Sequence, residues 1–393
     1  MPKKLRIVHV INSFECGGAE AMLCNLLLRT DRDRFDPSVV SLIDDLTVAG
    51  PVLAAGVPLV TIGMKPGLPD PRGVVRLAEH LRRLRPDVIQ TWMDHSNLIG
   101  GLAARTIPHA RLVWGIHHSN HLPGIAKRST LMTVAACAAL SHHLPERVVC
   151  CSEHSSRTYA KNGFAAEKLV VIPNGFDTEL FKPDPGARAA VRRELDIPAH
   201  APVIGLAARY DPFKDHSTFL RAAGILVATN PGVHLLLCGS NVHGANATLV
   251  SQIESLGLST HCHLLGPRRD MPPIYAAMDV NTSSSVSEAF PLAVGEAMAC
   301  GVPCVVTDVG DSALIVGHTG RVVPPREPAT LAAAWAEVLA MSADARSVLG
   351  LRARARIRAM FSLDAVVARY HELYETLVRP RRTGARADHF AYA

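Results

Sequence analysis

Aromatic residues are scarce in this sequence, and their scarcity limits the kinds of surface that the chain can build. Phe, Trp and Tyr make up 5% of the 393 residues. They do not interleave with the basic clusters at residues 82–85, 352–358 and 379–382. Proteins that bind single-stranded nucleic acid stack bases on aromatic rings beside a basic groove, so we expect no nucleic-acid partner. The basic clusters are typical of a face that meets anionic lipid, or of one that is only solvated.

Paired cysteine motifs and long apolar runs are also missing. Nine cysteines are scattered among apolar neighbours without any Cys-x-x-Cys, which indicates a reducing compartment. The apolar run 131–140 has ten residues, whereas a bilayer-spanning helix needs about 20. The apolar stretch 5–11 leads directly into Asn12 and shows no signal-peptide cleavage pattern. We therefore expect a cytoplasmic protein whose membrane contact, if any, is peripheral at the inner face of the plasma membrane.

Several catalytic signatures do not occur. The sequence contains no nucleophile elbow, no phosphate-binding Gly-x-x-x-x-Gly-Lys-Ser loop and no His-Glu-x-x-His. Its histidine clusters lack the paired spacing of zinc ligands. Asp31-Arg32-Asp33 resembles a divalent-ion motif but falls in a charged loop, away from any predicted strand end. Hydrolase and P-loop functions are therefore unsupported, and we expect no metal site.

Predicted strands and helices alternate in two series along the chain. The first series runs from a strand at 5–11 to one at 169–172, and the second from a strand at 203–207 to one at 304–307. Alternation of this kind predicts doubly wound parallel sheets with helices on both faces. The proline-rich segment 181–201 reads as a linker with its flanking helix. In open parallel sheets ligands bind outside the carboxyl ends of the strands, so two facing domains would share one cleft.

These boundaries define four predicted regions. The first domain covers residues 1–183 and the second covers residues 196–360. A last helix falls at 363–378, within the region 361–379. Residues 380–393 are basic and read as a disordered tail.

The segment 287–301 carries two carboxylates eight residues apart, Glu288 and Glu296. Pro291 fits a first helical turn, where its missing N–H costs nothing. Good helix formers follow, and Gly301 ends the helix. Glu288 is therefore predicted in a strand-to-helix loop and Glu296 inside the helix.

This arrangement has the chemistry of a site for a sugar joined to a phosphate. The N–H groups of residues 290–293 lack partners inside the helix, and a helix N-terminus attracts anions. Carboxylates accept hydrogen bonds from sugar hydroxyls. Glutamate pairs with this spacing are commonly just solvated charges. Glu296, however, is the single acid in an apolar helix, where an unpartnered carboxylate would be costly.

A second cluster of charge follows the strand predicted at 203–207. Arg209 and Lys214 lie five residues apart in the loop after this strand. Arginine can bind two phosphate oxygens at once and lysine acts as a point charge, so the pair could clamp a diphosphate. The alternative is an ordinary charged surface loop; the Glu288 segment near the same sheet edge favours the clamp.

Two further groups lie at predicted sheet edges of the first domain. Gly17 and Gly18 join the first strand to the first helix, where glycines would let a phosphate approach the backbone. They do not form the Gly-x-Gly-x-x-Gly of a dinucleotide binder. His117 and His118 leave the strand predicted at 111–116. One of them could hydrogen-bond a sugar hydroxyl or a developing charge, although a loop histidine is commonly just exposed.

Taken in order, these segments resemble the retaining glycosyltransferases of the GT-B fold, the GT4-type family. The resemblance rests on the following stretches: Gly17-Gly18-Ala19-Glu20, Val171 to Asp177, Arg209 with Lys214, Ser287 to Val306, and Val309-Gly310-Asp311. It implies a GT-B fold with two Rossmann-like domains facing a cleft and a C-terminal helix over 361–379 that crosses back to the first domain. One departure is Leu314, which stands where family members often carry a glutamate.

The resemblance also implies roles for individual residues. The implied donor-binding set is Gly17, Gly18, Arg209, Lys214, Glu288, Phe290, Pro291, Leu292 and Glu296. In that set Glu296 would bind the ribose, Arg209 and Lys214 the diphosphate, and Glu288 with the amides at 290–292 the sugar. The implied catalytic residues are Glu288 and one of His117 and His118. The family needs no metal, and the nucleotide-sugar is a co-substrate rather than a cofactor.

We therefore expect an enzyme that moves a sugar from a nucleotide-diphospho-sugar to a glycan or lipid-linked acceptor in cell-envelope polysaccharide synthesis. With retention, a leaving phosphate oxygen is the expected base. Two alternatives stay open at this point. One is a nucleotide-sugar epimerase of the same fold, and the other is a non-catalytic subunit that binds a nucleotide-sugar.

Overall fold

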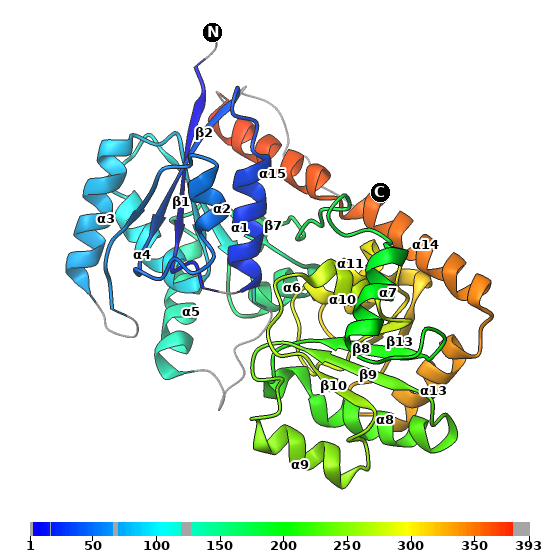
Figure 1. The fold of residues 1–393 in the computed structure, drawn as a ribbon. Helices are drawn as coiled ribbons and strands as arrows, with labels where there is room; N and C mark the ends of the chain where they lie inside the picture. The colour runs from blue at the N-terminus through cyan, green and yellow to red at the C-terminus, as the bar shows by residue number, and fades with distance from the viewer. Residues whose placement is uncertain (1–2, 16, 66–69, 119–126, 380–393) are drawn as a thin grey trace. The chain divides into compact units, whose positions relative to one another are not determined.

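The computed structural model describes residues 3–15, 17–65, 70–118 and 127–379. It divides into two compact units, shown in Figure 1. Unit 1 comprises Met1–Gly175 with Leu363–Ala393, and unit 2 comprises Phe176–Ser362. The tail predicted at 380–393 lies outside the described residues.

Unit 1 contains a seven-stranded sheet in the order β3-β2-β1-β4-β5-β6-β7, and all its pairings are parallel. Its strands are β1 (Leu5–Ile11), β2 (Phe35–Ser41), β3 (Leu59–Thr61), β4 (Val88–Trp92), β5 (Arg111–Ile116), β6 (Arg147–Cys150) and β7 (Leu169–Val171). Its α-helices are α1 (Gly18–Arg29), α2 (Gly50–Ala54), α3 (Pro71–Leu84), α4 (Asp94–Ala104), α5 (Arg128–Ser141), α6 (Glu153–Lys161) and α15 (Leu363–Val378).

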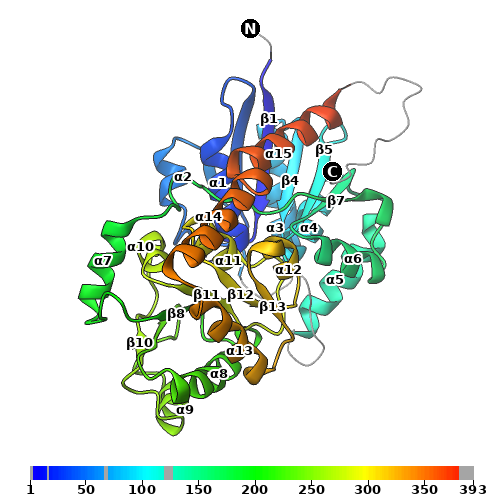
Figure 2. The ribbon, with the colours of Figure 1, turned by 90° about the vertical axis from the view of Figure 1, so that its right-hand side faces the viewer.

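Strand β1 shows how this sheet is covered on both faces. Ile7 and Ile11 pack into one core together with residues of α1, α2 and α15. Val8 and Val10 pack into the other core with residues of α3, α4 and α5. Successive side chains of a strand point to opposite faces, so one apolar run serves both layers. Figure 2 shows α15 lying over the sheet although it is far from β1 in the sequence.

Unit 2 contains a six-stranded sheet in the order β10-β9-β8-β11-β12-β13, also parallel throughout. Its strands are β8 (Val203–Ala207), β9 (His234–Cys238), β10 (Cys262–Leu264), β11 (Val280–Ser283), β12 (Cys304–Thr307) and β13 (Arg321–Val323). Its α-helices are α7 (Pro185–Glu194), α8 (His216–Thr229), α9 (Ala247–Ser255), α10 (Met271–Ala276), α11 (Leu292–Ala299), α12 (Ser312–Val316), α13 (Pro328–Leu339) and α14 (Ala343–Met360).

Both sheets reverse their strand order once, which confirms the prediction of two doubly wound parallel sheets. The chain builds outward from β1 in one direction and then returns to add β4 on the other side of β1. In unit 2 the same reversal occurs between β8 and β11. At such a switch point the two following loops diverge to opposite faces, and ligands bind in the gap that results. The fold therefore predicts one ligand-binding edge in each unit.

The short elements account for most of the differences from the sequence-based expectations. Strands at 5–11, 111–116, 203–207 and 304–307 were predicted with the bounds that are found. Helices α2, α6 and α12 and strand β13 were not predicted. The run 131–140 forms part of α5, where it helps to cover the sheet.

Candidate functional site

The loops after β8 and β11 are joined at the switch point of unit 2. The amide of Val286 donates to the carbonyl oxygen of Phe213 at 2.8 Å. The hydroxyl of Ser284 donates to the carbonyl oxygen of Lys214 at 2.9 Å. These two bonds fix the loop that carries Lys214 against the loop that carries Glu288.

Glu288 and Lys214 form an ion pair across these loops. Lys214 Nζ lies 2.5 Å from Glu288 Oε1, and the hydroxyl of Ser285 donates to the same oxygen at 2.6 Å. The Glu288 side chain is 10% exposed and that of Lys214 is 23% exposed. Two donors on one oxygen restrict the orientation of this half-sheltered carboxylate. The predicted loop position of Glu288 is confirmed.

The end of β12 and the loop that follows it also hold the Glu288 loop. Thr307 Oγ1 donates to the carbonyl oxygen of Ser285 at 2.6 Å. The amide of Asp311 donates to the carbonyl oxygen of Ala289 at 3.1 Å. Gly310 has a φ of +57°, and a Cβ there would lie 2.4 Å from the carbonyl oxygen of Glu288. Only glycine combines that backbone angle with so close an approach.

The start of α11 differs by one residue from the prediction. Pro291 is the N-cap, with φ −72° and ψ 103°, and the helix begins at Leu292 without a side-chain cap. Proline has no N–H, so among residues 290–292 only Phe290 and Leu292 can donate an amide hydrogen. The ring of Phe290 is buried, with Phe176 6.0 Å away between ring centroids. Any contact of Phe290 with a ligand must therefore come from its main chain.

Glu296 lies inside α11, as predicted, and it has a polar partner. The phenol of Tyr275, on α10, donates to Glu296 Oε2 at 2.7 Å. Burial raises the pKa of the Glu296 carboxyl, and the hydrogen bond from Tyr275 opposes that shift. Burial, reinforced by the neighbouring Glu296, raises the pKa of Tyr275 well above its ordinary range, so the phenol stays a donor. Sequence reasoning indicated that this acid needs a partner but could not identify Tyr275.

Arg209 is placed apart from this pair. Its side chain is 59% exposed, and Nε lies 3.1 Å from Asp211 Oδ2. Exposed ion pairs between near neighbours in sequence contribute little, so this contact leaves the guanidinium able to rearrange. The structure therefore brings Lys214 to Glu288, whereas Arg209 lies in the same loop with a different carboxylate.

In unit 1, Gly17 and Gly18 lie at the first turn of α1. Gly17 is the N-cap, in an extended conformation, and a Cβ there would lie 2.3 Å from a carboxylate oxygen of Glu20. Burial raises the pKa of Glu20. In the described structure the space that glycine leaves at this turn is used by the Glu20 carboxylate.

The two candidate histidines have different environments. The ring of His117 stacks on Trp92 with centroids 4.9 Å apart and an interplanar angle of 19°. Its ring nitrogens are buried without a hydrogen-bond partner among the described residues. Burial, with a smaller effect from His118, lowers the pKa of His117 to about 3. His118 is exposed, and its carbonyl oxygen accepts the hydroxyl of Ser155 at 2.9 Å. His117 is thus neutral at physiological pH.

Leu314, which replaces the glutamate expected from the family, lies in α12. Its carbonyl oxygen accepts Arg356 Nη2 at 2.6 Å, and the carbonyl oxygen of Ile315 accepts Arg356 Nε at 2.9 Å. Arginine here caps a short helix. The side chain at position 314 is aliphatic, so it supplies no carboxylate.

The described residues also bear on metal binding and membrane insertion. Within the described ranges, no group of three His, Cys, Asp or Glu side chains is arranged to hold a metal ion. Over the same ranges, none of the helices combines the length and the apolar character that crossing a lipid bilayer requires.

Comparison with known proteins places this geometry in a family. Residues 16–180 match the family described as Glycosyltransferase Family 4, and residues 201–341 match the family described as Glycosyl transferases group 1. A protein of Corynebacterium jeikeium named D-inositol 3-phosphate glycosyltransferase is 34% identical over 56% of this chain and 54% of its own length. A protein of the same name from Thermobispora bispora is 33% identical over 55% and 53%. The chain thus matches about half the length of these relatives.

Solved structures share the fold over nearly the whole chain. Anabaena Alr3699/HepE, solved in complex with UDP, has a TM-score of 0.82 at 24% identity, covering 95% of this chain and 100% of its own. The sucrose-phosphate synthase of Thermosynechococcus elongatus has a TM-score of 0.79 at 21% identity, covering 95% and 99%. At these identities the likeness shows a common fold. Since the two family matches together take up most of the sequence, this chain belongs to the group 1, family 4 glycosyltransferases.

Proposed function

We propose that this protein transfers a sugar from a nucleotide-diphospho-sugar to a glycan or lipid-linked acceptor, with retention of anomeric configuration and without a metal ion. The observation that carries the proposal is the Glu288–Lys214 pair at 2.5 Å, placed at the switch point of the unit 2 sheet and next to the start of α11. A cation, a carboxylate and the first amides of α11, which have no partner inside the helix, meet there. These are the groups that bind a diphosphate and a sugar hydroxyl.

The chemical task explains why a cation is needed at this point. When the bond between the anomeric carbon and the phosphate oxygen breaks, negative charge grows on the leaving diphosphate. Lys214, Arg209 and the first amides of α11 can stabilise that charge. A single preorganised donor of this kind is worth about 2–4 kcal/mol in the transition state. The leaving oxygen can then take the proton of the acceptor hydroxyl on the same face of the sugar, which accounts for retention.

The carboxylates have separate tasks in this proposal. Glu288 accepts hydrogen bonds from hydroxyls of the donor sugar, and it holds Lys214 in position before the donor binds. Glu296, just over one turn further along α11, accepts the ribose hydroxyls. The ring nitrogens of His117 are buried and His118 is exposed, so His118 is the better candidate for a contact with a ligand.

The relatives suggest which substrates to try first. The Anabaena structures contain UDP and UDP-glucose, and the sequence relatives are named for D-inositol 3-phosphate. The donors to test are UDP-glucose and other UDP-, GDP- and ADP-sugars. The acceptors to test are D-inositol 3-phosphate, oligosaccharides and polyprenyl-linked sugars. Anionic vesicles added to the lipid-linked acceptors would show whether a membrane surface assists.

The test compares wild type, Lys214→Ala and Glu288→Gln in a transfer assay with the active pair of substrates. We expect kcat to fall on the order of 10²-fold or more in each variant, as for loss of one electrostatic donor. Glu337→Gln is the matched control, because Glu337 forms an exposed ion pair with Arg321 and its loss should leave kcat unchanged. Unfolding curves establish that the variants remain folded.

Other outcomes would contradict parts of the proposal. Unchanged turnover in both site variants would overturn the site. A product of inverted configuration by NMR, or activity abolished by EDTA and restored by a divalent ion, would overturn retention or metal independence. New sugar stereochemistry from donor alone would favour the epimerase, and saturable donor binding without turnover on any acceptor would favour the binding subunit.

A further inference from the structure

The hydrogen bond between Tyr275 and Glu296 is the starting point of this inference. Tyr275 is 1% exposed, and its hydroxyl donates to Glu296 Oε2 at 2.7 Å. Among the described residues this is the one side-chain hydrogen bond that the Glu296 carboxylate receives. This bond occupies Oε2 and leaves Oε1 able to accept a hydrogen bond from a ligand.

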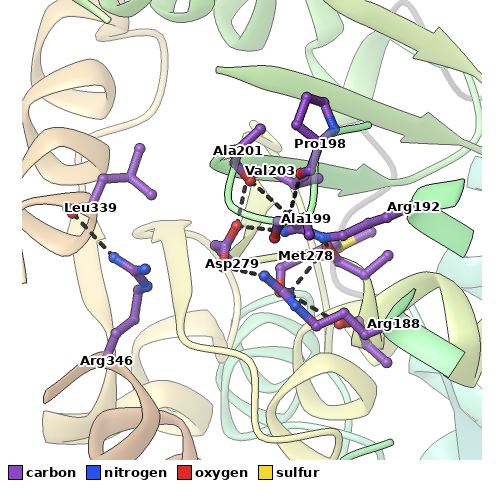
Figure 3. Close-up of polar contacts among 12 residues, drawn as sticks. Arg188, Arg192, Pro198, Ala199, Ala201, Val203, Met278, Asp279, Leu339 and Arg346 are labelled. Atoms are coloured by element: carbon purple, nitrogen blue, oxygen red, sulfur yellow. Dashed lines mark hydrogen bonds and ion pairs between the residues drawn. The ribbon is translucent and has the colours of Figure 1, made fainter. Parts of the chain in front are cut away.

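The helix that carries Tyr275 is held at its carboxyl end by two arginines from α7, as Figure 3 shows. Arg188 Nη1 donates to the carbonyl oxygen of Met278 at 3.0 Å, and Arg192 Nε donates to that of Ala277 at 3.1 Å. Asp279 neutralises both, with Oδ1 2.8 Å from Arg188 and Oδ2 2.8 Å from Arg192. Cations that cap the last carbonyls complement the helix dipole, so α10 is anchored directly after Tyr275.

This anchoring has a consequence for Glu296. Arg192 is 3% exposed, and it also binds the carbonyl oxygens of Ala199 and Ala201 at 2.9 and 2.8 Å. It thereby ties α10 to the segment that enters β8, the strand whose following loop carries Lys214. The Tyr275 phenol therefore extends from a helix that is fixed at its carboxyl end, and its hydrogen bond restricts the rotation of the Glu296 carboxylate.

We propose that Tyr275 is a positioning residue that orients Glu296 toward the ribose hydroxyls of the nucleotide and so makes the site prefer ribonucleotides to 2′-deoxyribonucleotides. The inference rests on the proposed function, since it requires a nucleotide at Glu296. A carboxylate with one oxygen held by a buried phenol can meet the 2′-hydroxyl without first losing rotational freedom. Without the phenol the carboxylate turns more freely, and that advantage is lost.

The alternative is that Tyr275 serves only as a core residue. Its ring packs near Phe181, with centroids 6.2 Å apart, and phenylalanine would preserve this packing. Tyr275→Phe therefore removes the hydroxyl alone. Tyr374→Phe is a matched control, because the Tyr374 hydroxyl in unit 1 is buried without a hydrogen-bond partner among the described residues.

The experiment measures binding of UDP, ADP and GDP and of their 2′-deoxy counterparts by calorimetry. For the nucleotide that binds wild type, we expect Tyr275→Phe to weaken the ribonucleotide about 3- to 10-fold, the range for one hydrogen bond. The 2′-deoxy nucleotide should change less than about twofold, because it lacks the group that Glu296 is oriented to meet. With the full donor, KM should rise while kcat stays near the wild-type value. Tyr374→Phe should leave both affinities unchanged.

The outcomes separate this inference from the proposed function. Equal weakening of both nucleotides by Tyr275→Phe would show a purely structural role and overturn the inference alone. A wild type that binds none of the three nucleotides would overturn the proposed function and the inference with it. In a Glu296→Gln background, Tyr275→Phe should cause no further loss of discrimination; a full additional loss would also contradict the coupling.

Discussion

The two units share one sheet plan but place different chemistry at their switch points. In unit 2 the edge between β8 and β11 carries opposite charges in contact, Lys214 and Glu288 at 2.5 Å. In unit 1 the corresponding strands are β1 and β4, and their last residues lead to a neutral aromatic group. Trp92 donates from Nε1 to His9 Nδ1 at 3.2 Å and stacks on His117. Burial lowers the pKa of both histidines to about 3, so this group carries no charge at neutral pH.

The difference shows that the topology sets which edge of the sheet can bind a ligand, whereas the side chains at that edge determine which ligand chemistry fits. A doubly wound sheet supplies a gap at the strand reversal in either unit. Only in unit 2 do the described residues there form a fixed ion pair beside open helix amides, the chemistry that an anion requires.

The largest expected effect tests how far the charged site depends on backbone contact. Gly310→Ala places a methyl group 2.4 Å from the carbonyl oxygen of Glu288 at a φ of +57°. We expect a loss of about 1–2 kcal/mol from the backbone angle and about 1–3 kcal/mol more from the clash. The Glu288 loop must move, so donor affinity should fall as well. Denaturant unfolding and donor titration measure the two effects.

Gly56→Ala in unit 1 is the control for this change. Gly56 has a φ of +69° with no heavy atom within 4 Å of the added Cβ, so it carries the backbone cost without the clash. A Gly310→Ala protein as stable as Gly56→Ala, and with normal donor affinity, would show that the Glu288 loop tolerates displacement.

The next prediction concerns the cost of keeping an acid in unit 2. Burial raises the folded-state pKa of Glu296 above its ordinary value of 4.5. The folded protein therefore holds this proton to higher pH than the unfolded chain does, and the free energy of unfolding falls as pH rises through that interval. Glu296→Gln removes the group, so it should raise the free energy of unfolding at pH 7 while weakening donor binding. The gain should vanish as pH falls below 4.5.

Urea unfolding of Glu296→Gln at several pH values tests whether stability increases where donor binding is lost. Glu337→Gln, at an exposed ion pair, should change stability by less than about 0.5 kcal/mol at any of them. A Glu296→Gln protein less stable than wild type at pH 7 would mean that the Tyr275 bond outweighs the burial of the carboxylate.

Most of the fold could be predicted from local patterns in the sequence. Strands such as Val203–Ala207 and Cys304–Thr307 are apolar runs bounded by loops, and their alternation with helices predicts parallel sheets. The helix α6 was missed because Glu153–Lys161 is polar and short, and it depends on a cap, in which Ser152 accepts the amide of Ser155. Strand β13, Arg321–Val323, is too short to show any period.

The candidate site was predictable where one motif carries it and not where distant segments meet. The loop place of Glu288 follows from Pro291 and the helix formers after it. The partners of the site residues do not: Tyr275 is 21 residues from Glu296, and Lys214 is 74 residues from Glu288. Position in sequence likewise could not distinguish His117 from His118. Only the structure separates them, because the ring of His117 stacks on Trp92 with its nitrogens buried and His118 is exposed.

The prediction with the smallest expected effect at neutral pH tests the neutral character of the unit 1 stack. His117 has a folded-state pKa of about 3 against an ordinary value of 6.5. As pH falls from 6.5 toward 3, His117 is protonated in the unfolded chain but stays neutral in the folded protein. The free energy of unfolding therefore decreases across this pH range. His117→Phe keeps a ring on Trp92 and should flatten the loss by at most about 1.4 kcal/mol per pH unit. Replacing the exposed His109 serves as the control. If both variants followed the wild-type acid limb, folded His117 would have to take up its proton over the same pH range as the unfolded chain, and this contrast between the two switch points would be lost at acid pH.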